Sequence, residues 1–135
     1  MATAENVQSL NINDLKRYAP DARVNQPLIM TKDFVTRMNC YEPGQVTPFH
    51  VHPNADEAIF CVEGHGAITF ADRPDAPIQP GTLISLPAGL PHGIAAAKDN
   101  RMVVIYVAKA GYTSVRIEGR PDEAGIPIPG EQSKK

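Results

Sequence analysis

Proline and glycine recur along this chain at short intervals and divide it into segments too short for ordinary helices. Clusters of these turn formers stand at residues 42–44 (EPG), 63–66 (EGHG), 79–81 (QPG) and 87–91 (PAGLP). Turn formers that recur about every 8 to 12 residues are typical of an all-β sandwich or barrel. The sequence therefore predicts an all-β fold, and 135 residues suffice for one such domain.

The segments between the turns have the apolar or alternating composition of β-strands. We expect strands at 33–41, 45–51, 57–63, 66–71, 82–86, 92–97, 101–108 and 112–118. No helical segment long enough for a βαβ unit separates them, which argues against a parallel α/β sheet. The runs AIFCV and MVVIYV are apolar on both alternating faces, which indicates that a second layer or a second subunit covers their outer side.

The two ends of the chain are less patterned than its middle. Residues 1–30 are predicted to be an N-terminal extension, with a short helix that Asn11 or Asn13 caps and that ends before Pro20. Residues 119–135 are predicted to be a C-terminal tail, either an unstructured end or an arm that packs on a partner. The barrel is then expected over 31–118.

Charge and composition exclude several classes of protein. A net charge of -2 and a pI near 6.0 give no basic surface for nucleic acid. No apolar run approaches the ~20 residues of a membrane span, and the first residues do not resemble a secretory signal. We therefore expect a cytoplasmic protein that binds neither membrane nor nucleic acid. Cys40 and Cys61 are expected to be buried free thiols rather than a disulfide.

The stretch FHVHPNADE contains the residues most suited to metal binding. His50 and His52 share one face of a predicted strand, with Cβ atoms ~6.5–7 Å apart, and a metal ~2.1 Å from each imidazole fits between them. Glu57 opens the next strand, and His92 opens a later one after a glycine- and proline-shaped loop. A single histidine is more often a surface or core residue than a ligand. Three of the four histidines at strand openings form a more specific pattern than any one alone.

The spacing of these residues resembles the two sequence motifs of the cupin superfamily. The first motif, G-x5-H-x-H-x3,4-E-x6-G, is matched by residues 44–64, GQVTPFHVHPNADEAIFCVEG. The second, G-x5-P-x-G-x2-H-x3-N, is matched by residues 81–96, GTLISLPAGLPHGIAA, except that Ala96 replaces the asparagine. The segment between the motifs is short, as in the smallest single-barrel members. The residues that match are Gly44, His50, His52, Glu57, Gly64, Gly81, Pro87, Gly89 and His92.

The resemblance implies a fold, a metal site and an oligomeric state. The fold is a single cupin barrel, a double-stranded β-helix or jelly roll, with short N-terminal and C-terminal extensions. The ligands carried over are His50, His52, Glu57 and His92, and the ion is a divalent transition metal such as Fe, Mn, Ni or Zn. A homodimer is expected as well. Ala96 removes no ligand.

The charge of such a site bears on what it binds. Three neutral imidazoles and one carboxylate leave a divalent ion with a net charge near +1, and an octahedral ion keeps two positions for other ligands. The site therefore favours a small oxygen-rich, anionic or chelating molecule, such as a 2-oxo acid, an enediol or a catecholate.

Other polar residues have competing interpretations. Arg37, Asn39 and Tyr41 share one face of their strand, so Arg37 and Tyr41 bind substrate if that face points inward, or lie in solvent if it points outward. Asp56 is a weaker ligand candidate because strand parity directs it away from Glu57. His65 is expected in a surface turn.

Apolar neighbours of the predicted ligands are also assigned by strand parity. Ile59 and Cys61 are expected to line the barrel below the metal, because they share the parity of Glu57. Phe49 and Phe60 have the opposite parity and are expected outside the pocket or at a dimer contact.

Three functions are consistent with these residues. The first is a metal-dependent enzyme that acts on a small oxygenated metabolite by dioxygenase, decarboxylase or isomerase chemistry. The second is a non-catalytic cupin that binds or senses a small ligand. The third is a domain in which the metal supports folding alone. Fold by itself does not choose among them.

Overall fold

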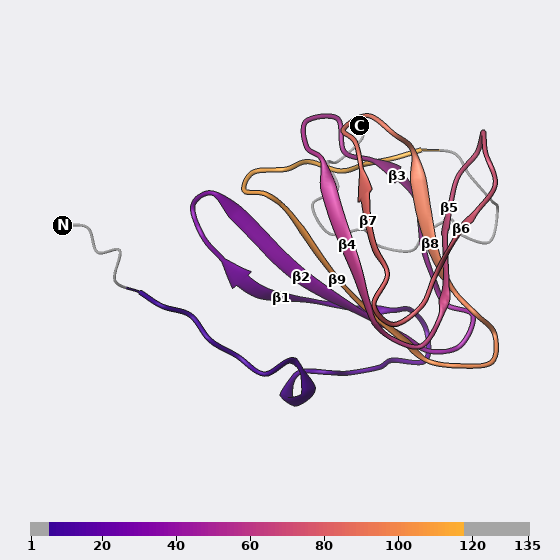
Figure 1. Cartoon of the computed structure of the whole chain (residues 1–135), viewed down its shortest axis with the longest axis horizontal. Helices are drawn as coiled ribbons and strands as arrows, with labels where there is room; N and C mark the ends of the chain where they lie inside the picture. Colours follow the sequence, from indigo (N-terminus) through magenta and orange to yellow (C-terminus); the bar gives the residue numbers. More distant parts are fainter. Residues whose placement is uncertain (1–5, 118–135) are drawn as a thin grey trace.

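The chain folds into two five-stranded antiparallel sheets packed face to face, as a computed structural model describes it for residues 6–117 (Figure 1). One sheet has the strand order β1-β2-β9-β4-β7, and the other has the order β10-β3-β8-β5-β6. The elements are η1 (Ile12–Asp14), β1 (Val24–Met30), β2 (Phe34–Tyr41), β3 (Val46–Val51), β4 (Glu57–Glu63), β5 (Gly66–Thr69), β6 (Ala76–Ile78), β7 (Leu83–Leu86), β8 (His92–Ala96), β9 (Met102–Lys109) and β10 (Val115–Arg116).

From β2 onward the chain crosses repeatedly between the two sheets, which is the connectivity of a jelly roll. β3, β8 and β10 belong to one sheet, whereas the strands that follow or precede them, β4, β7 and β9, belong to the other. All strand pairs are antiparallel. The all-β fold and the single cupin-type barrel predicted from the sequence are confirmed.

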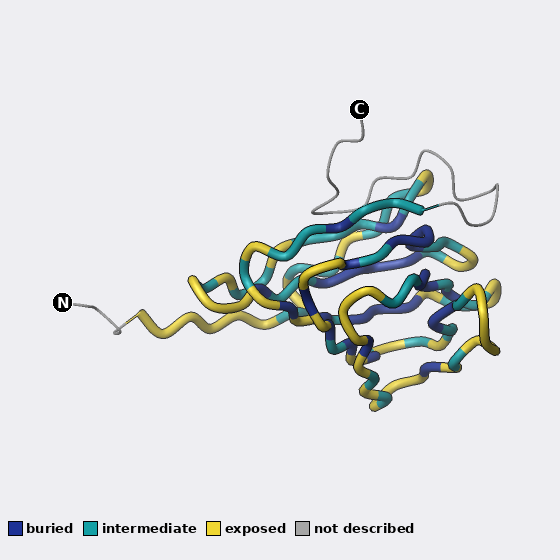
Figure 2. The backbone as a smooth tube through the Cα atoms, turned by 90° about the horizontal axis from the view of Figure 1, so that it is seen from above, coloured by how far each residue is buried: buried dark blue, intermediate teal, exposed yellow. Residues whose placement is uncertain are grey.

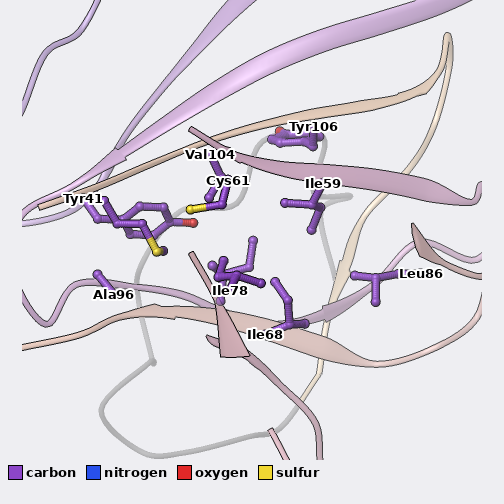
Figure 3. Close-up of a cluster of buried hydrophobic side chains, with 11 residues drawn as sticks. Tyr41, Ile59, Cys61, Ile68, Ile78, Leu86, Ala96, Val104 and Tyr106 are labelled. Atoms are coloured by element: carbon purple, nitrogen blue, oxygen red, sulfur yellow. The ribbon is translucent and has the colours of Figure 1, made fainter. Parts of the chain in front are cut away.

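The core lies between the two sheets. Buried side chains of Tyr41, Ile59, Cys61 and Val104 come from the first sheet and point toward Ile68, from the second (Figure 3). Ile59 and Cys61 therefore line the barrel interior, as predicted from their parity. A smaller cluster of Met38, Cys40 and Val103 lies on the other face of the first sheet, against Leu15 and Tyr18 of the N-terminal segment.

The two cysteines are free and buried, and they belong to different clusters. Cys61 is part of the main core, and Cys40 lies in the smaller cluster behind the sheet. The expectation of two buried thiols is confirmed.

The N-terminal segment differs from its prediction in two respects. Its helix is only the three-residue 3-10 turn Ile12–Asp14, capped by Asn11, whose side-chain oxygen accepts from the Asn13 amide at 2.9 Å. The cap at Asn11 and the end before Pro20 are as predicted, but the helix is shorter than expected, and residues 15–19 are irregular chain on the sheet. Strand β1 also lies within residues 1–30 and pairs with β2, so this part of the predicted extension contributes to the first sheet.

The remaining strands agree with the sequence except at two places. β6 lies in the proline-rich segment between 72 and 81, where no strand was predicted. β10 covers only Val115–Arg116, and residues 110–113 before it form a loop that hydrogen-bonds to His52 and Asn54 through Thr113. The predicted tail, 119–135, lies outside the described residues. Within residues 6–117, no helix has the length and apolar character of a membrane span.

Burial follows the layers of the barrel. The inner faces of both sheets are buried, whereas the turns and the segment that leads from the N-terminus are exposed (Figure 2). The exposed large apolar residues include Phe60, Leu83 and Val107 on the first sheet. Phe60 is thus outside the pocket, as predicted, whereas Phe49 is buried.

Candidate metal centre

Four side chains from three strands converge inside one end of the barrel. His50 lies near the end of β3 and His52 directly follows it, while Glu57 is the first residue of β4 and His92 the first residue of β8. His50 and His92 are direct partners across the β3–β8 ladder, which places their imidazoles side by side. All four residues are buried, and one ligand atom from each lies within 4.8 Å of the others.

Main-chain carbonyls fix the orientation of all three imidazoles. In each ring the Nδ1 atom lies at hydrogen-bonding distance from a carbonyl oxygen. The distances are 2.7 Å from His50 to Pro48, 3.0 Å from His52 to Thr113 and 3.0 Å from His92 to Leu90. A carbonyl only accepts, so each neutral ring carries its proton on Nδ1 and a lone pair on Nε2. This arrangement of a donated Nδ1–H and a free Nε2 is the one found in metal-bound histidines.

The Nε2 lone pairs and the Glu57 carboxylate face one another. Glu57 Oε1 lies 3.3 Å from His52 Nε2 and 3.2 Å from His92 Nε2. Among the described residues, neither Glu57 Oε1 nor His92 Nε2 meets the geometry of a hydrogen bond, although both are buried. Acceptors in such contact repel unless a cation or proton lies among them. Adjacent ligands of an ion at ~2.1 Å are ~3.0 Å apart, so the donor set fits a divalent metal.

The protonation states of two residues favour metal binding. Burial, together with the nearby His92, lowers the pKa of His50 to about 3, so that its ring is neutral at physiological pH. Burial alone would raise the pKa of Glu57, but the adjacent imidazoles of His52 and His92 outweigh it and the pKa is lowered. A neutral imidazole and an ionised carboxylate are the forms that bind a metal.

His52 has the opposite shift. Burial acts to lower the pKa of His52, but the neighbouring Glu57 outweighs burial and raises it. A proton on His52 can therefore compensate for part of the Glu57 charge when no metal is bound.

The loop before His92 is held by residues next to the ligands. The Ala88 amide donates to Asp56 Oδ1 at 2.8 Å, and the Gly89 amide donates to the carbonyl of His52 at 3.0 Å. Gly89 has a φ of 85°, which glycine adopts without strain. Asp56 is exposed and is not among the four clustered residues, as its strand parity led us to expect. Its side chain points away from Glu57 and instead stabilises the loop that carries His92.

His65, the remaining histidine, lies in the exposed turn between β4 and β5, 3.4 Å from Asp99. The predicted surface turn is confirmed.

A small cavity adjoins the cluster. Its volume is about 10 Å³, which is room for roughly one water molecule. Besides His50, His52 and Glu57, it is lined by Arg23, Asn39, Thr47, Ile94 and Tyr106. Burial raises the pKa of Tyr106 well above its usual value, so its hydroxyl remains protonated and can donate. The cavity therefore combines hydrogen-bonding groups and one cation with the candidate ligands.

The two residues predicted to bind substrate lie near this cavity without lining it. Arg37 donates from Nε to Asn25 Oδ1 at 2.6 Å, and the Asn25 amide in turn donates to Asn39 and Tyr106 at 2.6 and 3.1 Å. The Tyr41 side chain is buried in the core, with its hydroxyl 2.7 Å from Thr47 Oγ1. This strand face is therefore turned inward, and substrate binding by Arg37 and Tyr41 stays a prediction.

Sequence reasoning missed Arg23 and Tyr106. Arg23 directly precedes β1, and the register that pairs Val24 with Cys40 places it beside Tyr41. Recognition of β1 from sequence would have revealed this position. Tyr106 belongs to the apolar run MVVIYV, and its parity with Val104 was the available signal.

A jelly-roll barrel with three histidines and a glutamate inside one end defines a class of small metal-site β-barrels. Comparison with known families places the chain more narrowly: the family model described as "Cupin domain" matches residues 37–108. This range contains all four clustered residues and more than half of the chain. The chain belongs to the cupin domain family.

Relatives of known name share part of the sequence. The L-ectoine synthase of Aliivibrio fischeri (strain ATCC 700601 / ES114) is 34% identical over 83 residues, which cover 61% of this chain and 62% of that protein. The L-ectoine synthase of Vibrio campbellii (strain ATCC BAA-1116) is 33% identical over 81 residues, 59% of this chain and 61% of the relative. The matched region thus spans less than two thirds of these relatives.

Solved structures agree with the fold. A protein with a double-stranded β-helix domain from Klebsiella pneumoniae superposes with a TM-score of 0.77 at 16% identity, covering 84% of this chain and 100% of that one. The polyketide cyclase RemF from Streptomyces resistomycificus has a TM-score of 0.74 at 20% identity and covers 87% of this chain and 90% of its own. At these identities the likeness concerns the fold alone.

Proposed function

We propose that this cupin is a metal-dependent enzyme that acts on a small oxygenated metabolite of anionic or chelating character. The observation that carries the proposal is the convergence of four buried acceptors. In each imidazole the Nδ1–H donates to a main-chain carbonyl, so the Nε2 lone pair is available to a metal. Such a set is unfavourable without a cation and is suited to a divalent transition metal such as Fe, Mn, Ni or Zn.

Two groups of residues surround the proposed ion, the four candidate ligands and the polar residues of the adjoining cavity. His50, His52, Glu57 and His92 would hold the metal, which when bound polarises a carbonyl or activates a water molecule. Tyr106 and Thr47 contribute hydroxyls to the cavity wall, and Asn39 contributes an amide. These groups are placed to orient a polar ligand by hydrogen bonds, and the surrounding core excludes bulk water.

The relatives named L-ectoine synthase support an enzyme rather than a structural domain. Dioxygenase, decarboxylase and isomerase or lyase chemistry are all compatible with three imidazoles and one carboxylate. The reaction type therefore requires direct measurement.

A non-catalytic cupin that binds or senses a small ligand is the second candidate. The cavity of about 10 Å³ is as compatible with this candidate as with an enzyme, because in either case the site must open further to admit a ligand larger than a water molecule.

The test starts from protein purified without added metal and analysed for its elements. We expect near-stoichiometric transition metal in the wild type, and strong loss of it in a His50→Ala/His52→Ala double variant. His65→Ala is the matched control, because it removes an exposed histidine that lies beyond the opposite end of β4 from Glu57 and leaves the four ligands in place. Equal metal content in the wild type and the double variant would contradict the metal site.

Turnover is then measured on a panel of 2-oxo acids, enediols and catechols, with oxygen uptake followed in parallel. L-ectoine is added to the panel because it appears in the names of the relatives. Metal-dependent turnover of any member supports the enzyme. Full metal content with ligand binding and no turnover would favour the second candidate.

We further propose a homodimer, formed through the outer face of the first sheet. Phe60, Leu83 and Val107 are large apolar side chains exposed on three of its strands. Phe60 is the direct partner of Leu83 in the β4–β7 ladder, so these two form a continuous apolar surface. A cytoplasmic location and the absence of nucleic-acid partners stay predictions from composition.

A further inference from the structure

Arg23 is a buried cation that has no counter-charge among residues 6–117. Only 7% of its surface is exposed, and it lies directly before β1 on the inner side of the first sheet. Its Nε is buried and has no hydrogen-bond partner among residues 6–117. In the same part of the chain, no carboxylate lies within the 4.0 Å of an ion pair with it, whereas Arg73 and Arg101 each have one.

Such an arrangement is unfavourable for the protein alone. Burial lowers the pKa of Arg23, although a guanidinium remains charged in proteins. Arginine is almost never buried unless it is paired, because removal of the charge from water is costly. The free protein therefore retains a destabilising group at this position, which points to a partner that arrives from solution.

The location of Arg23 indicates where that partner binds. Arg23 lines the same cavity as His50, His52 and Glu57. The Glu57 charge is directed at His52 and His92, at 3.3 and 3.2 Å, and does not neutralise Arg23. A divalent ion among the four ligands would add a further net charge near +1. The cavity then has two unneutralised positive charges at neighbouring points.

The shape of the guanidinium selects among anions. Its planar fork of N–H donors pairs with the two oxygens of a carboxylate in a bidentate manner. Asn39, Thr47 and Tyr106 line the rest of the cavity and offer uncharged hydrogen-bonding groups. The volume of about 10 Å³ is that of roughly one water molecule, so a carboxylate ligand requires the side chains around the cavity to move apart.

We propose that Arg23 binds a carboxylate group of the ligand, so that the site accepts small carboxylates with a second oxygen or nitrogen donor directed at the four-residue cluster. This inference rests on the proposed function and names its substrate class. It also assigns carboxylate binding to Arg23, whereas the nearby Arg37 is already engaged by Asn25 at 2.6 Å.

The test compares small carboxylates with their neutral amides. Acetate, lactate and pyruvate, and the corresponding amides, are titrated into wild type, Arg23→Gln, Arg23→Lys and Arg73→Gln proteins by calorimetry and thermal shift. Arg73 lies in an exposed turn and pairs with Asp72, so Arg73→Gln removes one guanidinium away from the cavity. Each protein is measured both metal-free and after loading with Zn²⁺.

We expect wild type and Arg73→Gln to prefer a carboxylate over its amide by at least ~10-fold, the usual size of a hydrogen bond to a charged group. Arg23→Gln should lose that preference through weaker carboxylate binding, while its affinity for the amide is unchanged. Arg23→Lys should keep part of it. Equal preference in wild type and Arg23→Gln, or no carboxylate-dependent effect in wild type, would overturn the proposal.

Two further readouts separate this proposal from its alternatives. The metal content of Arg23→Gln should equal that of the wild type. A wild type that itself binds no metal would contradict the proposed function, but it would not contradict the role of Arg23. The midpoint of unfolding without ligand should not fall in Arg23→Gln, because the substitution removes an unpaired buried charge. A large fall with unchanged carboxylate preference would identify Arg23 as a structural residue and overturn the proposal.

Discussion

The Oε1 atom of Glu57 lies 3.2 Å from the Nε2 atom of His92, and neither of these buried atoms makes a hydrogen bond within residues 6–117. Both atoms are acceptors in the tautomer that the Leu90 carbonyl selects. Two acceptors in contact are tolerated when a cation lies between them. Removal of metal should therefore change the arrangement and protonation of these four residues far more than it changes the fold of the barrel.

Replacement of the carboxylate provides a direct test of this relationship. Glu57→Gln should reduce metal affinity by more than ~100-fold, because it removes a ligand and not only a supporting group. Without metal, the variant should be as stable as wild type, since its amide can donate to a histidine Nε2. Elemental analysis and competition with a chelator measure the affinity, and urea unfolding measures the stability.

Glu63→Gln is the matched control, because Glu63 ends the same strand and is exposed beside Lys16. This control should bind metal like wild type. Wild-type metal affinity in Glu57→Gln would contradict the ligand assignment.

A smaller effect is expected from the residue that supports the loop before His92. Asp56→Ala removes the acceptor of the Ala88 amide, so the loop should position His92 less well. Metal affinity should fall by ~10-fold, the lower range for supporting residues of metal sites. Asp75→Ala, an exposed aspartate on a different turn, should leave the affinity unchanged. Equal affinities in the two variants would show that the Ala88 contact does not position the ligand.

The sequence predicts the structure best in the segments that contain the two motifs. The bounds predicted for strand β4 are those found, because its apolar run AIFCV stands between two turn signals. The four clustered residues were identified because their spacing repeats two family motifs. Glu57 and His92 open their strands and His50 and His52 lie at the end of theirs, so all four come together at one end of the barrel.

The features that the sequence did not predict have a common physical cause: each forms through contacts with residues that are distant in the sequence. Strand β1 contains Asn25, Gln26 and Pro27, which disfavour strands locally, and it forms because β2 offers an edge. β6 pairs with β5 through only three residues of a proline-rich segment. The burial of Arg23 follows from the pairing of β1, so its proximity to the cluster was inaccessible to local patterns.

The glycines at two turns allow a matched comparison of stability. Gly64 has a φ of 72°, and a Cβ there would lie 1.8 Å from the Arg101 carbonyl oxygen. Gly89 has a φ of 85°, but a Cβ there would meet nothing within 4 Å. Gly89→Ala should therefore cost only the backbone strain of ~1–2 kcal/mol. Gly64→Ala should cost ~3 kcal/mol or more, because main chain must also move.

Urea unfolding of the two alanine variants measures this difference. Equal losses of unfolding free energy would contradict the close approach of Gly64 to Arg101.

His50 contributes to the pH dependence of the metal-free protein. Its pKa is lowered from 6.5 to about 3 in the folded state, mainly by burial. Between these values the unfolded chain binds more protons than the folded one, so stability rises with pH and is lost as pH falls from 6.5 toward 3. The contribution of His50 to this loss is ~4 kcal/mol by pH 3.

Urea unfolding over this pH range measures the effect, and His50→Leu should have a shallower dependence than wild type. His65→Asn, which changes an exposed histidine, should retain the wild-type slope. A wild-type slope in His50→Leu would show that another group governs the acid sensitivity.

The apolar outer face of the first sheet predicts the oligomeric state. Phe60 and Leu83 are direct cross-strand partners with exposed fractions of 41% and 70%. If this face joins two copies, Phe60→Lys/Leu83→Lys should convert a dimer to a monomer, because four lysines would meet across a symmetric interface. Val7→Lys is the control, since Val7 is also exposed but lies on the N-terminal segment. Light scattering after size exclusion gives the mass, and a double variant that remains a dimer would place the interface elsewhere.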